Sequence, residues 1–150
     1  MKASKNTLLY LVAGIVSGAL WFLLALLFDD GWGIPPGAVG RIAGVSCAVV
    51  TGILISFLFR PAFRRVPLLA FILLPCVTLP LALVSFSFLL WLSRLALGIQ
   101  FSPPPVGGDL RLLTESYLIY GLLGSGPVLY ILALLNQYAM RSLLNRNAEH

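Results

Sequence analysis

The feature that most constrains this chain is a set of four apolar runs, each long enough to cross a bilayer. They cover residues 7–28, 37–59, 66–93 and 113–138. The charged residues within them are Arg41 and Glu115, both close to one end of a run. Only 10% of all residues are charged, whereas a soluble domain carries about 25%. The 150 residues therefore predict an all-α integral membrane protein, one domain with four transmembrane helices in two hairpins, and they exclude a soluble enzyme.

The connections between the runs are of different kinds. Asp29 and Asp30 open a turn-rich segment, residues 60–65 form a short basic link, and residues 95–112 form a proline-rich loop. A tight link predicts antiparallel neighbouring helices. The first run follows two lysines, as a signal peptide does. It is longer than the apolar core of such a peptide and lacks a small-residue cleavage site before Asp29, so we expect a retained helix.

The distribution of Lys and Arg predicts the orientation of these helices. Seven of the ten basic residues fall on the side of the two termini and of the 60–65 link, and three fall on the other side. The positive-inside rule then places both termini in the cytoplasm (N-in/C-in), as expected for a bacterial inner-membrane protein. Tyr117 is expected at the outer boundary and Tyr10 at the inner one. The basic ends are expected to meet anionic headgroups, because they form no dense cluster of the kind that binds nucleic acid.

Small residues recur every four positions along the second run. They are Gly40, Gly44, Ala48, Gly52 and Ser56, and the first run adds Gly14 and Gly18. Small residues allow helix backbones to approach closely in a membrane, where lipid tails are as apolar as leucine. Two interpretations stay open. The line of small residues packs against the first helix inside one hairpin, or it forms the subunit interface of a homo-oligomer.

Proline and glycine predict breaks in the later helices. Gly121, Gly124 and Gly126 precede Pro127, which removes one backbone donor and frees the carbonyl of Leu123. Such a break is either a packing device or, with Gly124, Ser125 and Pro127, a ligand contact. Pro75 and Pro80 predict kinks in the third run, with Thr78 or Ser85 available to satisfy the freed carbonyls. Arg41 is expected to anchor the helix at the outer interface, paired with Asp29, Asp30 or a phosphate headgroup, or else to bind an anionic ligand there.

The sequence offers little material for catalysis or metal binding. The single histidine is the last residue, and the polar residues inside the runs are hydroxyls and two amides, Asn136 and Gln137, expected at the inner boundary. A hydroxyl without a base is not a nucleophile at neutral pH. Cys47 and Cys76 are expected to be buried spacers rather than a redox pair. We therefore predict no catalytic residue, no metal site and no cofactor.

Two functions follow as hypotheses. The first is a small non-enzymatic membrane protein that self-associates or serves as the membrane subunit of a complex, with basic inner loops that meet a cytoplasmic partner; membrane components of bacterial defence and immunity systems share this general build. The alternative is a small pore or transporter for a solute or lipid that uses the broken fourth helix. A lipid-modifying enzyme working through Arg41 and the outer acidic residues is the weakest interpretation.

Overall fold

We describe the fold from a computed structural model, which describes residues 2–27, 37–59, 67–98, 110–124 and 126–146. Within these ranges every regular element is helical. The elements are α1 (Lys2–Leu27), α2 (Gly37–Leu58), α4 (Leu68–Leu73), α5 (Pro75–Leu97), α6 (Leu110–Ile119), the π-helix η2 (Tyr120–Gly124) and α7 (Gly126–Arg146).

Two helical segments are long and apolar enough to cross a membrane. They are Gly37–Leu58 and Leu68–Leu97, and a third is added if the bent pair Leu110–Leu123 and Gly126–Ser142 counts as one span. The apolar part of α1, Thr7–Leu23, is shorter than these candidate spans. The predicted all-α fold is confirmed, and apolar helices of this length suggest a membrane location.

The break between α4 and α5 is stabilised by backbone and tyrosine contacts. Pro75 begins α5, and the carbonyl that its ring frees, that of Phe71, accepts a hydrogen bond from the Leu74 amide at 3.3 Å. The neighbouring carbonyl of Ile72 accepts one from the Tyr130 hydroxyl of α7 at 2.6 Å. For the Phe71 carbonyl, the backbone tightens by one residue and meets the carbonyl itself, while help from Thr78 or Ser85 at the carbonyls freed by Pro75 and Pro80 stays a prediction.

The glycine- and proline-rich segment before α7 coincides with a sharp bend. The α-helix of α6 widens into η2, and the segments on either side of the break meet at 81°. A π-helix is rare outside single turns in longer helices. In this chain it directly precedes the position where Pro127 cannot donate to the helix ladder.

The buried side chains form two separate clusters along the bundle. The larger one joins α1, α2, α5, α6 and α7 through Phe22, Cys47, Phe86, Tyr117 and their neighbours. In it the Phe86 ring packs edge-on against Tyr117, with 5.2 Å between centroids. The smaller cluster is built on Tyr10 of α1 and Met140 of α7. The Tyr10 and Tyr117 rings are both buried in helix contacts, and their predicted places at the membrane boundaries stay predictions.

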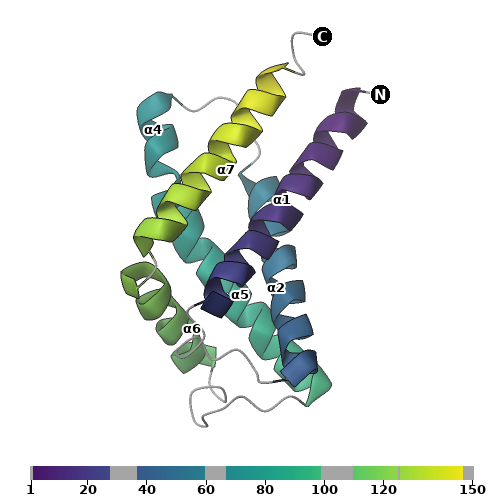
Figure 1. The fold of residues 1–150 in the computed structure, drawn as a ribbon, viewed down its shortest axis with the longest axis vertical. Coiled ribbons are helices and arrows are strands. Elements are labelled where there is room, and N and C mark those ends of the chain that lie inside the picture. The colour runs from purple at the N-terminus through teal and green to yellow at the C-terminus, as the bar shows by residue number, and fades with distance from the viewer. Residues whose placement is uncertain (1, 28–36, 60–66, 99–109, 125, 147–150) are drawn as a thin grey trace.

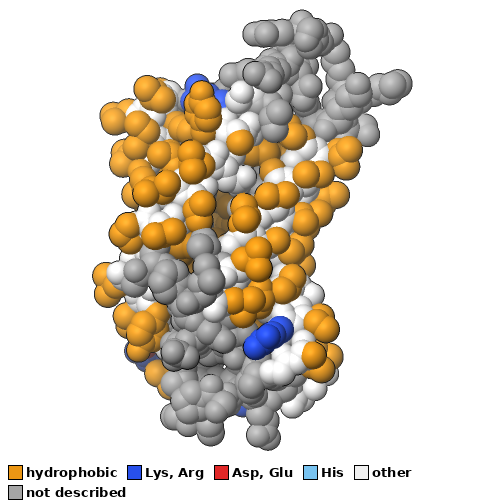
Figure 2. Space-filling model, viewed as in Figure 1, with side chains coloured by type: hydrophobic (Ala, Val, Ile, Leu, Met, Phe, Trp, Pro, Cys, Tyr) orange, Lys and Arg blue, Asp and Glu red, His pale blue; other side chains and the backbone are white. Residues whose placement is uncertain are grey.

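The two ends of the bundle collect different elements (Figure 1). The start of α1, the start of α4 and the end of α7 lie toward one end, whereas the starts of α2 and α6 and the end of α5 lie toward the other. Hydrophobic side chains cover most of the described surface between the ends (Figure 2). Many large ones are exposed, among them Leu68, Leu69, Ile42 and Leu123. An apolar outer surface of this extent suits contact with lipid.

Candidate functional site: an uncharged cavity in the helix bundle

The close approach of α1 and α2 positions one wall of the site. A side chain at Gly18 would overlap the backbone carbonyl of Ala48, and one at Gly52 would overlap the carbonyl of Gly14. A Cβ at Gly14 would lie 2.6 Å from the Cα of Ile53. The two backbones are therefore in direct contact, which glycine alone permits. The structure thus places the small-residue lines of both helices against each other within one chain.

The other residues singled out from the sequence do not gather at one place. Gly40 and Ser56 are buried along α2, and Gly44 faces the Phe22 ring. Arg41 is exposed at the start of α2, and Pro127 is exposed on α7. Gly124 ends η2. Ser125, Asp29 and Asp30 lie outside the described residues, so the expected pairing of Arg41 with either aspartate is not addressed by the structure.

A cavity of about 90 Å³ lies between α1, α2, α5 and α7. Ser17, Trp21, Thr51, Ser56, Thr78, Asn136 and Gln137 line it together with aliphatic side chains and Phe86. On α1, α2 and α7 the hydroxyl and amide residues fall between members of the large core cluster and members of the small one, while Trp21 and Phe86 belong to the packing of the large cluster. Uncharged polar side chains thus occupy a layer that is closed above and below by apolar packing.

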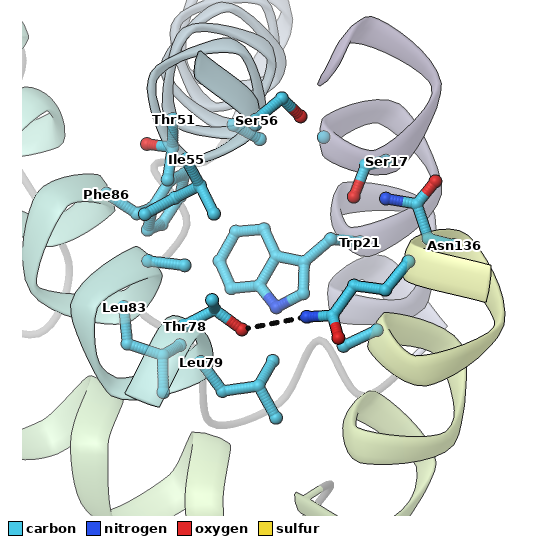
Figure 3. A pocket seen from close by; sticks show the side chains of 16 residues that line it. Ser17, Trp21, Thr51, Ile55, Ser56, Thr78, Leu79, Leu83, Phe86 and Asn136 are labelled. Carbon is cyan, nitrogen blue, oxygen red and sulfur yellow. Dashed lines mark hydrogen bonds between the residues drawn. The ribbon is translucent and has the colours of Figure 1, made fainter. Parts of the chain in front are cut away.

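Gln137 and Thr78 form the polar centre of this layer (Figure 3). The Gln137 Nε2 atom donates a hydrogen bond to the Thr78 hydroxyl at 3.3 Å, and both side chains are buried. The other amide atom, Gln137 Oε1, is buried without a hydrogen-bond partner among the described residues, and so is the Thr51 hydroxyl. A buried polar atom left unpaired costs about 1–3 kcal/mol, so each of these atoms calls for an explanation.

Trp21 and Ser17 of α1 complete the wall that faces Gln137. Trp21 lies between Thr78 and Asn136 in the view of Figure 3 and packs edge-on against Phe86 with 4.5 Å between ring centroids. The Ser17 hydroxyl and the Asn136 amide point toward one another. The indole thus forms a rigid apolar face beside groups that donate and accept hydrogen bonds.

A wider recess lies beside this cavity. It measures about 350 Å³ and lies between α1 and α7. Ser17, Trp21, Leu79, Ala133 and Asn136 line both spaces, so the two adjoin. The outer part of the recess is lined by leucines, of which Leu20 is 50% exposed and Leu135 is 59% exposed. Figure 2 shows a hollow between the apolar surfaces of these two helices.

Sequence reasoning missed Gln137. The amide was expected at the inner membrane boundary, but the side chain is only 4% exposed and reaches Thr78 of α5 inside the bundle. The available signal was its spacing. Gln137 lies four residues after Ala133 and three before Met140, so all three share one face of α7.

The chemistry of the cavity is that of a neutral hydrogen-bonding site. Among the described residues its lining contains hydroxyl, amide and indole groups and no ionisable side chain. Hydroxyl groups without a base do not act as nucleophiles. Cys47 is buried in the large core cluster, whereas Cys76 is exposed on α5, so the expectation of two buried thiols is wrong for Cys76. Comparisons with protein-family models, with curated proteins and with solved structures found no match.

Proposed function

We propose that this protein is a non-enzymatic inner-membrane protein that works as a self-associating or complex-forming subunit. In this proposal four helices cross the membrane, with α1 as the first and the bent pair α6–α7 as the last, and both termini are cytoplasmic. The observation that carries it is the interior of the bundle. Direct backbone contact between α1 and α2 holds the first hairpin together, and the described lining of the cavity carries no ionisable group, which supports a role in contact rather than in proton or group transfer.

The charge distribution supports a cytoplasmic partner. The seven basic residues of the predicted inner side belong to segments that start α1, precede α4 and end α7, and these elements lie toward one end of the bundle. At this end the Arg141 guanidinium lies over the Phe71 ring, 5.2 Å from its centroid. Such an end attracts anionic headgroups and acidic protein surfaces.

The subunit interface of this proposal lies on a surface other than the small-residue line of α2. That line is occupied by α1, which leaves the exposed apolar faces for association. Leucine at Gly52 would therefore disturb the hairpin before any subunit contact. If the small-residue line itself were the subunit interface, leucine at Gly52 would instead disturb the contact between subunits.

Native mass spectrometry of the protein extracted with its lipids tests the proposal. The chain has a mass of 16.2 kDa, and we expect a particle of several copies or of one copy with a larger protein partner. The matched control is the same particle after the lipid is exchanged for a harsh detergent, which releases the single chain. A particle of one chain and lipid in the native extract would contradict the proposal.

The second candidate, a pore or transporter, is favoured by the 81° break before α7. Unwound helices of this kind bind solutes in several transporters. In that case leucine at Gly124 and Pro127 would block solute flux into proteoliposomes and leave the mass of the particle unchanged. Pro127 is not among the described residues that line the cavity between α1, α2, α5 and α7, which supports treating the break and the cavity as separate features.

A further inference from the structure

We propose that the cavity and its recess form a binding site for a neutral lipid, one acyl chain with an uncharged hydroxyl- or carbonyl-bearing head such as a monoacylglycerol. The head occupies the polar layer beside Gln137 and Thr78, and the chain leaves between α1 and α7 into the bilayer. This site does not depend on the proposed subunit function.

Two side chains that line the cavity, Gln137 and Thr51, each carry an unpaired polar atom. Gln137 and Thr51 are at least 95% buried, and Gln137 Oε1 and the Thr51 hydroxyl have no partner among the described residues. A protein that uses such groups only for packing meets them with other side chains. Here the Gln137 side chain lines the cavity while its oxygen is covered, so a turn of the amide would bring this oxygen to a donor bound in the cavity.

The described residues that line the cavity carry no charge. A carboxylate, a phosphate or an ammonium group moved into this layer would lose its hydration and meet no counter-charge among the lining residues. A neutral head loses less hydration and regains hydrogen bonds from Gln137, Thr78 and Ser17. The chemistry of the cavity therefore selects an uncharged head of a few non-hydrogen atoms.

The cavity and the recess together have a shape that suits a small head with an apolar chain. The cavity of about 90 Å³ has room for several waters or a small head, and it adjoins the leucine-lined recess of about 350 Å³ between α1 and α7. A water-soluble ligand needs no apolar exit of this kind, whereas an acyl chain fits one. Leu20, Leu132 and Leu135 provide the apolar contacts along it.

The test uses the full chain in phosphatidylcholine nanodiscs and a monoacylglycerol that carries a photoreactive diazirine in its acyl chain. Peptide mapping after illumination should show saturable labelling of the segments that contain Leu20 and Leu132. Unlabelled monoacylglycerol should remove it. The lysophosphatidylcholine and the alkane of the same chain length should not, because one carries charge and the other has no head.

Variants of the polar layer provide the second readout. Gln137→Met and Thr78→Val should each weaken competition by unlabelled monoacylglycerol about fivefold, the effect of one lost hydrogen bond. Thr114→Val is the matched control, since the Thr114 hydroxyl pairs with Ser87 at 3.0 Å and does not line the cavity. Circular dichroism establishes that each variant is folded, and having two variants keeps the test valid if one of them is not.

Three outcomes would overturn the inference. The first is labelling that rises linearly with probe content, which is the behaviour of a surface exposed to bulk lipid or of a cavity filled with water alone. The second is equal competition by all three unlabelled compounds, which describes an apolar groove without a head site. The third is competition unchanged in both Gln137→Met and Thr78→Val.

Discussion

At the scale of the residue, the amide of Gln137 is the main polar group in the interior of the bundle. Gln137 lies in an apolar helix, where an uncharged polar side chain is tolerated if it faces neighbouring helices. It donates to Thr78 through a long bond of 3.3 Å and leaves its oxygen unpaired. A group held in this way contributes little to the stability of the empty protein, which is typical of side chains retained for binding rather than for packing.

Gln137→Met should therefore raise the stability of the ligand-free protein. The substitution removes a buried unpaired oxygen, which costs about 1–3 kcal/mol, and loses one hydrogen bond that is worth about 0.6 kcal/mol in membrane interiors. We expect a net gain of roughly 1 kcal/mol, measured by unfolding in sodium dodecyl sulfate with the helical circular dichroism signal.

Thr114→Val should change the stability in the opposite direction to Gln137→Met. Its hydroxyl is paired with that of Ser87, so its loss should destabilise the fold by about 0.6 kcal/mol. A loss of stability in Gln137→Met as large as that in Thr114→Val would mean that the amide is a structural contact.

Backbone contact determines the packing of the first hairpin at the scale of the element. Gly14, Gly18 and Gly52 meet backbone atoms of the opposite helix, which cannot rotate away. A side chain at Gly44 would meet the Phe22 ring, which can rotate away. Equal spacing in the sequence thus conceals two kinds of contact with different tolerance for a methyl group.

Gly18→Ala should separate α1 from α2. The added methyl overlaps the Ala48 carbonyl, and overpacking of this kind costs about 1–3 kcal/mol. The loss is measured as a shift of the unfolding midpoint in detergent. Gly44→Ala should cost less, because the ring of Phe22 moves aside.

Gly126→Ala is the matched control for the extra methyl itself. Its Cβ would meet nothing closer than the Gly121 carbonyl at 3.7 Å, an ordinary contact. Alanine also favours the helix over glycine, so this variant should be neutral or slightly stabilising. Equal losses in Gly18→Ala and Gly126→Ala would show that the α1–α2 contact is looser than described.

The whole molecule is organised by charge at its ends and by apolar surface between them. Seven basic residues belong to the segments at one predicted side, while Arg111 and Glu115 form an exposed ion pair of 2.7 Å near the start of α6, at the other. An exposed pair of this kind adds little stability. The asymmetry of Lys and Arg is what orients a membrane protein during insertion.

Single cysteines test the proposed orientation. In intact cells a membrane-impermeant maleimide should label Gly107→Cys, in the predicted outer loop, and should label Ala148→Cys only after permeabilisation. The unmodified chain, with Cys47 and Cys76 inside apolar helices, measures the background. Labelling of Ala148→Cys in intact cells would contradict the arrangement with both termini inside.

The sequence alone determined the helical class, the apolar character of the segments and the break before α7, whereas the kink predicted at Pro80 is not seen as a break, because α5 continues through this residue. Hydrophobic runs, prolines and glycines act through neighbours a few residues away, and their effects can be read locally. The break before α7 follows from Gly121, Gly124, Gly126 and Pro127 in this way. The number of membrane crossings and their direction stay predictions.

Only the tertiary structure decided which residues meet. Gln137 and Thr78 are far apart in the chain and come together because α5 and α7 pack across the same space. The small residues of α2 face α1 rather than a second copy because Gly14 and Gly18 complete the contact within the chain. Side-chain partners of this kind depend on the angle and depth at which whole helices pack, and no local pattern in the sequence encodes these quantities.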